Sequence, residues 1–308
     1  MLNLICFSSL FSLLCASGCI LHALKGRLSG DAFTQTKARI RTWGVILLSL
    51  FAATLLGKSG LLWFFGLVSY LAFKELVSIV PTRLADRRTL FWAYIAIPIQ
   101  FILIAKGFYV LSLIFIPVYM LLFLPLRLVL TGETQSFIRS LSFLHWGMMT
   151  MVFCLAHAVL LFLPCKQPFP LEMRISTLLF LILLTQANDI AQFLFGKCFG
   201  RSKIVPSVSP NKTWAGFIGG VCCTTSLGYC LGQLMTPLSP LLSLGAGLII
   251  GVMGFFGDLT MSALKRDLQI KDTSLMLPGH GGIIDRIDSL IFTAPLFFHY
   301  FNFFWMDL

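Results

Sequence analysis

Two stretches in the last third of the chain combine charged side chains in a pattern suited to phosphate chemistry. In the first, Asp258, Ser262 and Lys265 are spaced by four and three residues, and Arg266 follows directly. In a helix this spacing places the first three side chains on one face. A carboxylate, a hydroxyl and an ammonium group together suit Mg²⁺ and phosphate, because Mg²⁺ takes few carboxylates and shares its other positions with water and phosphate oxygens.

The second stretch is a glycine-rich turn followed by two carboxylates. Residues 278–282 read Pro-Gly-His-Gly-Gly, and Asp285 and Asp288 follow one helical turn apart at the mouth of the final apolar segment. Glycine lets backbone N–H groups approach an anion closely, and a helix start carries positive dipole charge. By itself such a turn is weak evidence, since a charged loop is usually only solvated. For His280, a structural hydrogen bond and a catalytic role are equally open.

Two of the carboxylates lie within or at the ends of apolar runs. Asp189 follows the run 182–188, and Asp258 ends the run 249–257. An ionised Asp near hydrocarbon costs about 2.5–3.5 kcal/mol on insertion scales unless it is paired or hydrated, so such residues usually mark a site. The alternative is an Asp at a helix end that is bathed by water.

Membrane-spanning helices must position these residues. Of the 308 residues, 57% are hydrophobic and only 11% are charged, whereas soluble domains carry about 25% charged residues. The predicted fold is therefore all-α, a polytopic integral membrane protein with about nine or ten transmembrane helices. The apolar segments run roughly over 4–24, 43–57, 60–73, 93–105, 108–126, 141–163, 175–195, 214–234, 241–263 and 289–305.

The basic residues predict how the helices are oriented. Alternate loops hold 19 of the 23 Lys and Arg residues, which by the positive-inside rule makes those loops cytoplasmic and puts both termini outside. The net charge of +11 therefore mainly reflects the orientation of the helices in the membrane, and we expect no nucleic-acid partner. The basic loops also suit anionic lipid head groups and nucleotide phosphates. The basic loops are 25–42, 74–92, 127–140, 196–213 and 264–288, and the other side holds Lys58, Lys106, Lys166 and Arg174.

Other features argue for one membrane domain. The nine Cys lie mostly in apolar runs without C-x-x-C spacing, so we expect neither a zinc site nor a disulfide framework. No repeat or long linker divides the chain. We expect residues 1–140 to form scaffold helices and residues 141–308 to form the helices that carry the catalytic loops. No Lys or Arg precedes the first apolar run and five follow it by residue 41, so residues 1–24 fit an uncleaved helix better than a signal peptide.

The longer pattern resembles a known family. Two segments carry the resemblance: about fifteen specified positions agree over the 27 residues from Ser262 to Asp288, and a second match runs from Asp189 to Trp214. Both are similar to the phosphatidate cytidylyltransferases (CDP-diacylglycerol synthases), specifically from about residue 185 onward and generally before that. The first segment reads Ser262-Ala-Leu-Lys265-Arg266-x4-Lys271-Asp272-Thr-Ser274-x2-Leu277-Pro278-Gly-His280-Gly281-Gly282-Ile-Ile-Asp285-Arg286-Ile-Asp288, and the second reads Asp189-x6-Gly196-Lys197-x2-Gly200-Arg-x-Lys203-x2-Pro206-x-Val-Ser209-Pro210-Asn211-Lys212-Thr213-Trp214.

The resemblance implies a reaction and a set of site residues. CMP would pass from CTP to phosphatidic acid, or a similar lipid phosphate, in the bacterial inner membrane, with the catalytic loops in the cytoplasm. Asp258 and Asp285 would hold Mg²⁺, a second cation being compatible with the site, and Lys265 and Arg266 would join them in catalysis. A homodimer is one expected assembly. Substrate-binding residues would be Ser209, Lys212, Lys197, Lys203, Ser262, Lys271, His280, Gly281, Gly282 and Arg286, and Asp189, Asp272 and Asp288 would lie behind them or add further ligands.

Two departures from the family pattern leave the lipid acceptor open. Ala215 and Met261 stand where many members carry Glu, which is typical of a divergent paralogous branch. The alternatives are a CTP-dependent enzyme for another lipid phosphate or lipid alcohol, an inactive membrane paralog, and a transporter. A transporter is expected to show repeated halves and matching broken helices, and the sequence shows neither.

Overall fold

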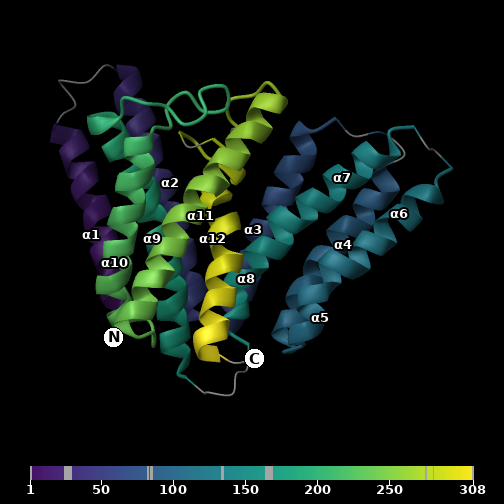
Figure 1. Ribbon diagram of the computed structural model, residues 1–308, viewed down its shortest axis with the longest axis horizontal. Coiled ribbons are helices and arrows are strands. Elements are labelled where there is room, and N and C mark those ends of the chain that lie inside the picture. Colours follow the sequence, from purple (N-terminus) through teal and green to yellow (C-terminus); the bar gives the residue numbers. More distant parts are fainter. Residues whose placement is uncertain are drawn as a thin grey trace.

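The computed structural model describes residues 2–23, 30–81, 83, 86–132, 135–163, 169–274, 276–279 and 281–306. Over these residues the secondary structure is helical, and no β-strand is formed (Figure 1). The helices are α1(Leu2–Ala23), α2(Gly30–Leu55), α3(Gly57–Ile79), α4(Asp86–Ala105), α5(Tyr109–Ile114), α6(Leu121–Val129), α7(Phe137–Met148), α8(Leu155–Leu160), α9(Leu171–Phe199), α10(Trp214–Met235), α11(Pro240–Asp267) and α12(Ile284–Phe301), with π-helices η1(Phe115–Met120), η2(Met149–Cys154) and η3(Asn302–Met306).

The all-α, polytopic membrane architecture is confirmed. In the described part of the chain, nine helical segments are long and apolar enough to cross a membrane. They include α5, η1 and α6 as one span and α7, η2 and α8 as another. The final helix, α12, is 18 residues long and carries three charged side chains in its first two turns, which keeps it outside that count.

The helices run alternately up and down, and the polar loops gather at one end. Both chain termini lie at the lower end of Figure 1, while the segments 200–213, 268–274 and 276–279 lie at the upper end, close to the start of α10 and the end of α11. We call this upper end the basic end, because the loops predicted to be rich in Lys and Arg lie there.

The helices extend further than the apolar runs that predict them. The helix α2 begins at Gly30 although its apolar run begins at about 43, and α12 begins at Ile284 although its run begins at about 289. Hydropathy marks only the part of a helix that faces hydrocarbon, whereas backbone hydrogen bonding continues into the interface. The turn predicted at Lys58-Ser59 lies slightly earlier in the chain. The chain reverses between Leu55, the last residue of α2, and Gly57, the first residue of α3, where Gly57 has a φ of +65°.

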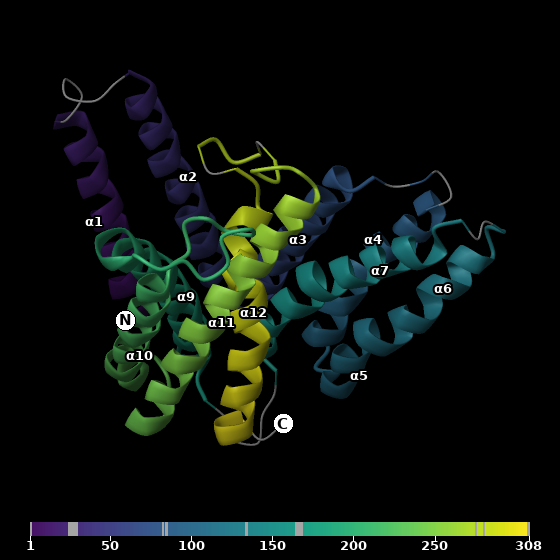
Figure 2. The ribbon, with the colours of Figure 1, turned by 45° about the horizontal axis from the view of Figure 1, so that its top comes forward.

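Close helix contacts position the C-terminal half. The helices α9, α10, α11 and α12 pack side by side (Figure 2). At Gly228 of α10 an added Cβ would lie 2.7 Å from the Cα of Gly247 on α11, so the two backbones meet directly, as small residues allow in membranes. Asn188 links α9 to α10 and α11. It accepts a hydrogen bond from Thr224 of α10 and donates one to the carbonyl of Gly251 of α11.

Candidate active site

An ion pair at the basic end joins the segment Asp189–Trp214 to Asp258 of α11, four residues before the segment Ser262–Asp288. Lys212 Nζ lies 2.5 Å from Asp258 Oδ2 and donates a hydrogen bond of 3.2 Å to Gln192 Oε1. It also lies 4.9 Å from the ring centre of Phe255, a cation–π contact. The next residue, Thr213, caps α10 by accepting a hydrogen bond from the N–H of Gly216. The cap fixes where the loop ends and so where Lys212 is placed.

The ion pair lies in a cavity of about 240 Å³ between α9, α10, α11 and the loop before α10. Ser262 completes the polar wall of α11, because its hydroxyl donates to Asp258 Oδ1 at 3.3 Å. Gln192 is buried, and within the described residues its Nε2 has no hydrogen-bond partner. A buried unpaired donor is costly unless a ligand accepts from it. The cavity is lined by Asp189, Gln192, Phe193, Ser209, Asn211, Lys212, Thr213, Gly216, Phe217, Phe255 and Asp258.

Three carboxylates gather at this point. The negative charges of Asp258 and Asp189 repel that of Asp288 on α12. Ser289 donates hydrogen bonds to two of the three, Asp189 and Asp288. Its hydroxyl donates to Asp189 Oδ1 at 2.9 Å and its backbone N–H donates to Asp288 Oδ1 at 2.8 Å. The positive charges of Lys212 and Arg286 attract Asp189. Like charges held together in a half-buried site favour the binding of cations.

A second set of contacts surrounds Asp285. Lys265 Nζ donates to Asp285 Oδ1 at 2.7 Å. Asp285 Oδ2 accepts from the N–H of Thr273 and the N–H of Gly282, each at 3.1 Å. It also lies 3.0 Å from the hydroxyl of Thr273, whose single proton is donated to Glu75. Asp285 is 8% exposed, and its contacts with Thr273 and Gly282 hold the loop before α12 in place, while Lys265 ties it to α11. In this structure Asp285 therefore organises the signature loop.

Glu75 completes this second set and was not predicted from the sequence. Both of its carboxylate oxygens are used: Oε1 accepts from the hydroxyl of Thr273 and, at 3.3 Å, from the N–H of Ile284, while Oε2 accepts from Ser274 at 3.0 Å and from the N–H of Ile283 at 2.8 Å. Glu75 is 2% exposed. It satisfies the free N–H groups at the start of α12. Glu75 follows Lys74 just beyond the apolar run 60–73, in a predicted basic loop, so the sequence pattern did not single it out.

The donor chemistry of the site fits a divalent cation. Asp258 is 29% exposed in its side chain and lines the cavity together with Asp189, with the hydroxyl of Ser262 beside it. In the described part of the chain no three His, Cys, Asp or Glu side chains are close enough to hold one ion together. Mg²⁺ does not require such a cage, since it is usually bound by one or two carboxylates plus water and substrate phosphates.

The remaining predicted residues are placed less centrally. Arg266 is exposed and donates to the carbonyl of Val208 at 3.2 Å, which fixes the loop before α10. Ser209 lines the cavity. Lys197, Lys203, Lys271 and Asp272 are exposed, and none of them lines the cavity. His280 lies outside the described residues.

The two departures from the family pattern differ in environment. Met261 is 1% exposed and belongs to the hydrophobic core, whereas Ala215 is half-buried in the first turn of α10. A carboxylate at position 261 would be buried and would need a partner.

The chain is similar in sequence to several known proteins. The chain is 42% identical to the uncharacterized protein YnbB of Escherichia coli (strain K12) over 298 residues, which are 96% of this chain and 97% of that protein. It is 40% identical over 129 residues to the phosphatidate cytidylyltransferase of Staphylococcus aureus (strain COL), covering 39% of this chain and 46% of that enzyme. Over 125 residues it is 42% identical to the phosphatidate cytidylyltransferase of Chlamydia trachomatis, covering 38% and 40%.

The match therefore extends over nearly the whole of one relative but over less than half of each named enzyme. The sequence model of the Cytidylyltransferase family matches residues 37–304. This range contains the Lys212–Asp258 and Lys265–Asp285 pairs and the carboxylate of Glu75. The chain belongs to the cytidylyltransferase family.

Proposed function

We propose that the protein transfers CMP from CTP to the phosphate of phosphatidic acid, giving CDP-diacylglycerol and pyrophosphate. One observation carries the proposal: Lys212 of the segment Asp189–Trp214 pairs with Asp258, four residues before the segment Ser262–Asp288, in one cavity at the basic end. The family match and the two named enzymes support a nucleotidyltransferase.

The reaction needs charge neutralisation more than a covalent nucleophile. An oxygen of the lipid phosphate forms a bond to the α-phosphorus of CTP, and the bond from that phosphorus to the bridging oxygen of the β-phosphate breaks as pyrophosphate leaves. Two polyanions must therefore be held in line. Lys212 and Lys265 are the cationic groups nearest to the carboxylates, and each is now paired with one of them, which keeps its ammonium group at the site.

The chain's own residues account for binding and orientation. Asp258, with Asp189 or Asp288 beside it, would hold Mg²⁺, which supplies a positive charge that neutralises the phosphates. That Asp285 also binds the metal stays a prediction. The unpaired Nε2 of Gln192 offers a hydrogen bond inside the cavity, and Lys212 is free to exchange Asp258 for a phosphate when a cation takes its place.

The proposal includes the orientation. The basic end faces the cytoplasm, where CTP is available, and the protein lies in the bacterial inner membrane. The lipid phosphate then approaches from the cytoplasmic leaflet. The distribution of Lys and Arg supports this orientation.

Purified full-length protein, α-³²P-labelled CTP and Mg²⁺ test the proposal against a panel of acceptors: phosphatidic acid, lysophosphatidic acid, an isoprenoid phosphate and diacylglycerol. The expected product is a labelled CDP-lipid from phosphatidic acid, absent with Asp258→Asn. Preference for a different lipid phosphate would show that phosphatidic acid is not the natural acceptor. Absence of labelled lipid with every acceptor, or equal labelling by Asp258→Asn, would contradict the reaction.

A further inference from the structure

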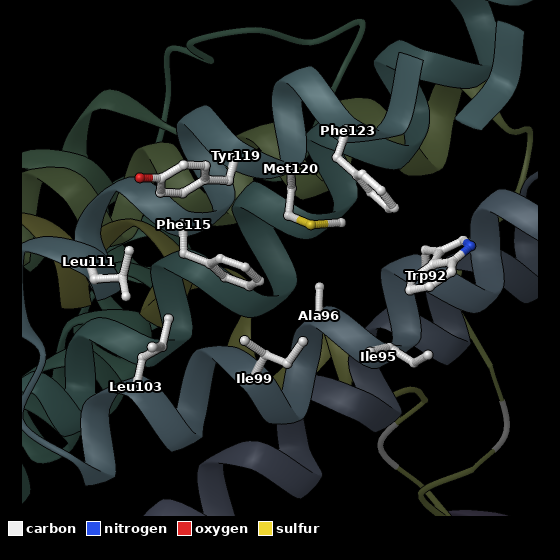
Figure 3. Close-up of a pocket in the computed structure, with 10 residues that line it drawn as sticks. All are labelled: Trp92, Ile95, Ala96, Ile99, Leu103, Leu111, Phe115, Tyr119, Met120 and Phe123. Carbon is white, nitrogen blue, oxygen red and sulfur yellow. The ribbon is translucent and has the colours of Figure 1, made fainter. Parts of the chain in front are cut away.

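A second cavity lies far from the active site, between α4 and the span formed by α5, η1 and α6. Its volume is about 510 Å³. Figure 3 shows that side chains from both spans line it, with Trp92 and Phe123 toward one end and Leu103 and Leu111 toward the other. In Figure 2 these helices lie on the opposite side of α3 from α9 and α10. This groove, defined by the residues labelled in Figure 3, has no part in the chemistry described above.

The sequence on both walls follows one pattern. On α4 the lining residues Trp92, Ala96, Ile99 and Leu103 recur at helical spacing, and Arg88 stands one turn before Trp92 on the same stripe. The facing stripe has the same ending: Leu111, Phe115, Tyr119 and Phe123 recur every four residues, and Arg127 stands one turn beyond Phe123. Each apolar stripe therefore ends in an arginine, and both arginines lie toward the basic end.

Among the residues that the structure describes, no carboxylate forms an ion pair with Arg127. Its guanidinium carbon lies 5.6 Å from the ring centre of Trp92. Its Nε is buried, and in the described part of the chain it has no hydrogen-bond partner. A guanidinium group suits phosphate oxygens because its N–H groups lie in a planar fork. A buried donor next to an apolar groove therefore points to a ligand that is both apolar and anionic.

The length of the groove fits one leaflet. From Trp92 to Leu103 the α4 wall rises by about 16 Å at the helical rise per residue. The hydrocarbon core of a bilayer is about 30 Å thick, so the groove covers roughly half of it, beginning at the basic end. An acyl chain that enters from that interface fits this span.

We propose that the groove binds an anionic glycerophospholipid of the leaflet at the basic end. One acyl chain lies along the two stripes, and the phosphate contacts Arg127 and Arg88. The proposal does not depend on the reaction at Asp258, because binding is measured here without CTP.

The test uses quenching of Trp92 by lipid. Full-length protein in detergent is titrated with dioleoyl phosphatidic acid brominated on its acyl chains, and Trp92→Phe is titrated in parallel to remove the signal of the other tryptophans. We expect a quenching component that Trp92→Phe lacks. Brominated diacylglycerol, which has no phosphate, should produce that component only at concentrations about tenfold higher, the weakening expected when an ionic hydrogen bond is lost.

Two pairs of variants separate the charge from the groove. Arg127→Gln should weaken the apparent affinity for the anionic lipid about tenfold, while Arg87→Gln, an exposed neighbour of Arg88 that lies about 100° away around α4, should leave it unchanged. Ile99→Trp fills the groove and should abolish the saturable component, whereas Ile102→Trp, which is 55% exposed on α4 and does not line the groove, should not.

Three outcomes overturn the proposal. Equal affinities for phosphatidic acid and diacylglycerol would leave the arginines without a role. Unchanged binding in Ile99→Trp would place the lipid elsewhere. Absence of Trp92 quenching, together with an intermolecular disulfide in an Ile99→Cys variant, would assign the groove to contact with a second copy of the chain.

Discussion

The carboxylate of Glu75 accepts a hydrogen bond of 2.8 Å from the backbone N–H of Ile283, although 208 residues separate them. Glu75 belongs to α3, in the half of the chain predicted to be scaffold, and Ile283 directly precedes α12. The carboxylate also receives the hydroxyls of Thr273 and Ser274. Through Glu75, a scaffold helix holds the loop that carries Asp285.

Glu75→Gln should therefore lower both stability and activity. Whichever way the amide is turned, its NH₂ group faces two of the four donors that the carboxylate accepts. Leaving buried donors unpaired costs about 3 kcal/mol, so we expect a lower thermal midpoint in detergent and a marked loss of kcat. Asp267→Asn, an exposed carboxylate at the end of α11, is the control. Parent-like unfolding and turnover in Glu75→Gln would contradict this role.

Asp258→Asn and Asp285→Asn should fail for different reasons. Asp258 has one cationic partner and one hydroxyl, so its amide should fold normally and lose CMP transfer by about 10²-fold or more at saturating Mg²⁺. Asp285 accepts hydrogen bonds from Lys265 and from the N–H groups of Thr273 and Gly282, so its amide should lose activity and also unfold at lower temperature. Thermal unfolding measured beside turnover checks the difference. A stable, inactive Asp285→Asn would favour a metal ligand at that position.

Gln192→Leu should raise the KM for CTP by about tenfold, the loss expected for one hydrogen bond to a charged group. It removes the unpaired donor of the cavity and the acceptor that orients Lys212. Gln186→Leu, also on α9 but outside the cavity lining, is the matched control. The KM values come from initial rates measured over a range of CTP concentrations. Equal KM values for the parent protein and Gln192→Leu would exclude a role of Gln192 in nucleotide binding.

Gly281→Ala and Gly132→Ala separate backbone strain from crowding. Both glycines have positive φ, +79° and +77°. Around Gly132 an added Cβ meets no described atom within 4 Å, whereas at Gly281 it would lie 2.7 Å from Asp285 Oδ2. Gly132→Ala should cost about 1 kcal/mol from strain alone, while Gly281→Ala should cost more and abolish turnover. Similar losses of stability and activity in both variants would show that Asp285 tolerates the added methyl group.

Cysteine labelling in intact cells should establish the orientation. With an impermeant maleimide, and with the parent protein as background for the native cysteines, Lys58→Cys and Lys106→Cys should be labelled while Lys203→Cys and Lys271→Cys should not. The first pair lies at the end opposite the basic end. Labelling at 203 or 271 before the cells are opened would reverse the orientation and remove access to cytosolic CTP.

The amino-acid sequence by itself determined the class of fold and the family. Apolar runs of the length that a bilayer requires can form only helices there, because lipid offers no partner to a free backbone group. The spacing of Asp258 and Ser262 also predicted their contact, since residues four apart on a helix are neighbours. Such inferences depend on local periodicity, which the sequence contains directly.

The tertiary structure decided which charges meet. Lys212 with Asp258, Lys265 with Asp285, and Glu75 with the start of α12 each join separate segments of the chain. Charge type alone does not choose among such pairings, because they depend on how the helices pack. Packing also exposed Lys197 and Lys203 and buried Met261. The physical reason is that close approach of α10 and α11 at their glycines sets the distance between loops, and a one-dimensional pattern carries no information on that distance.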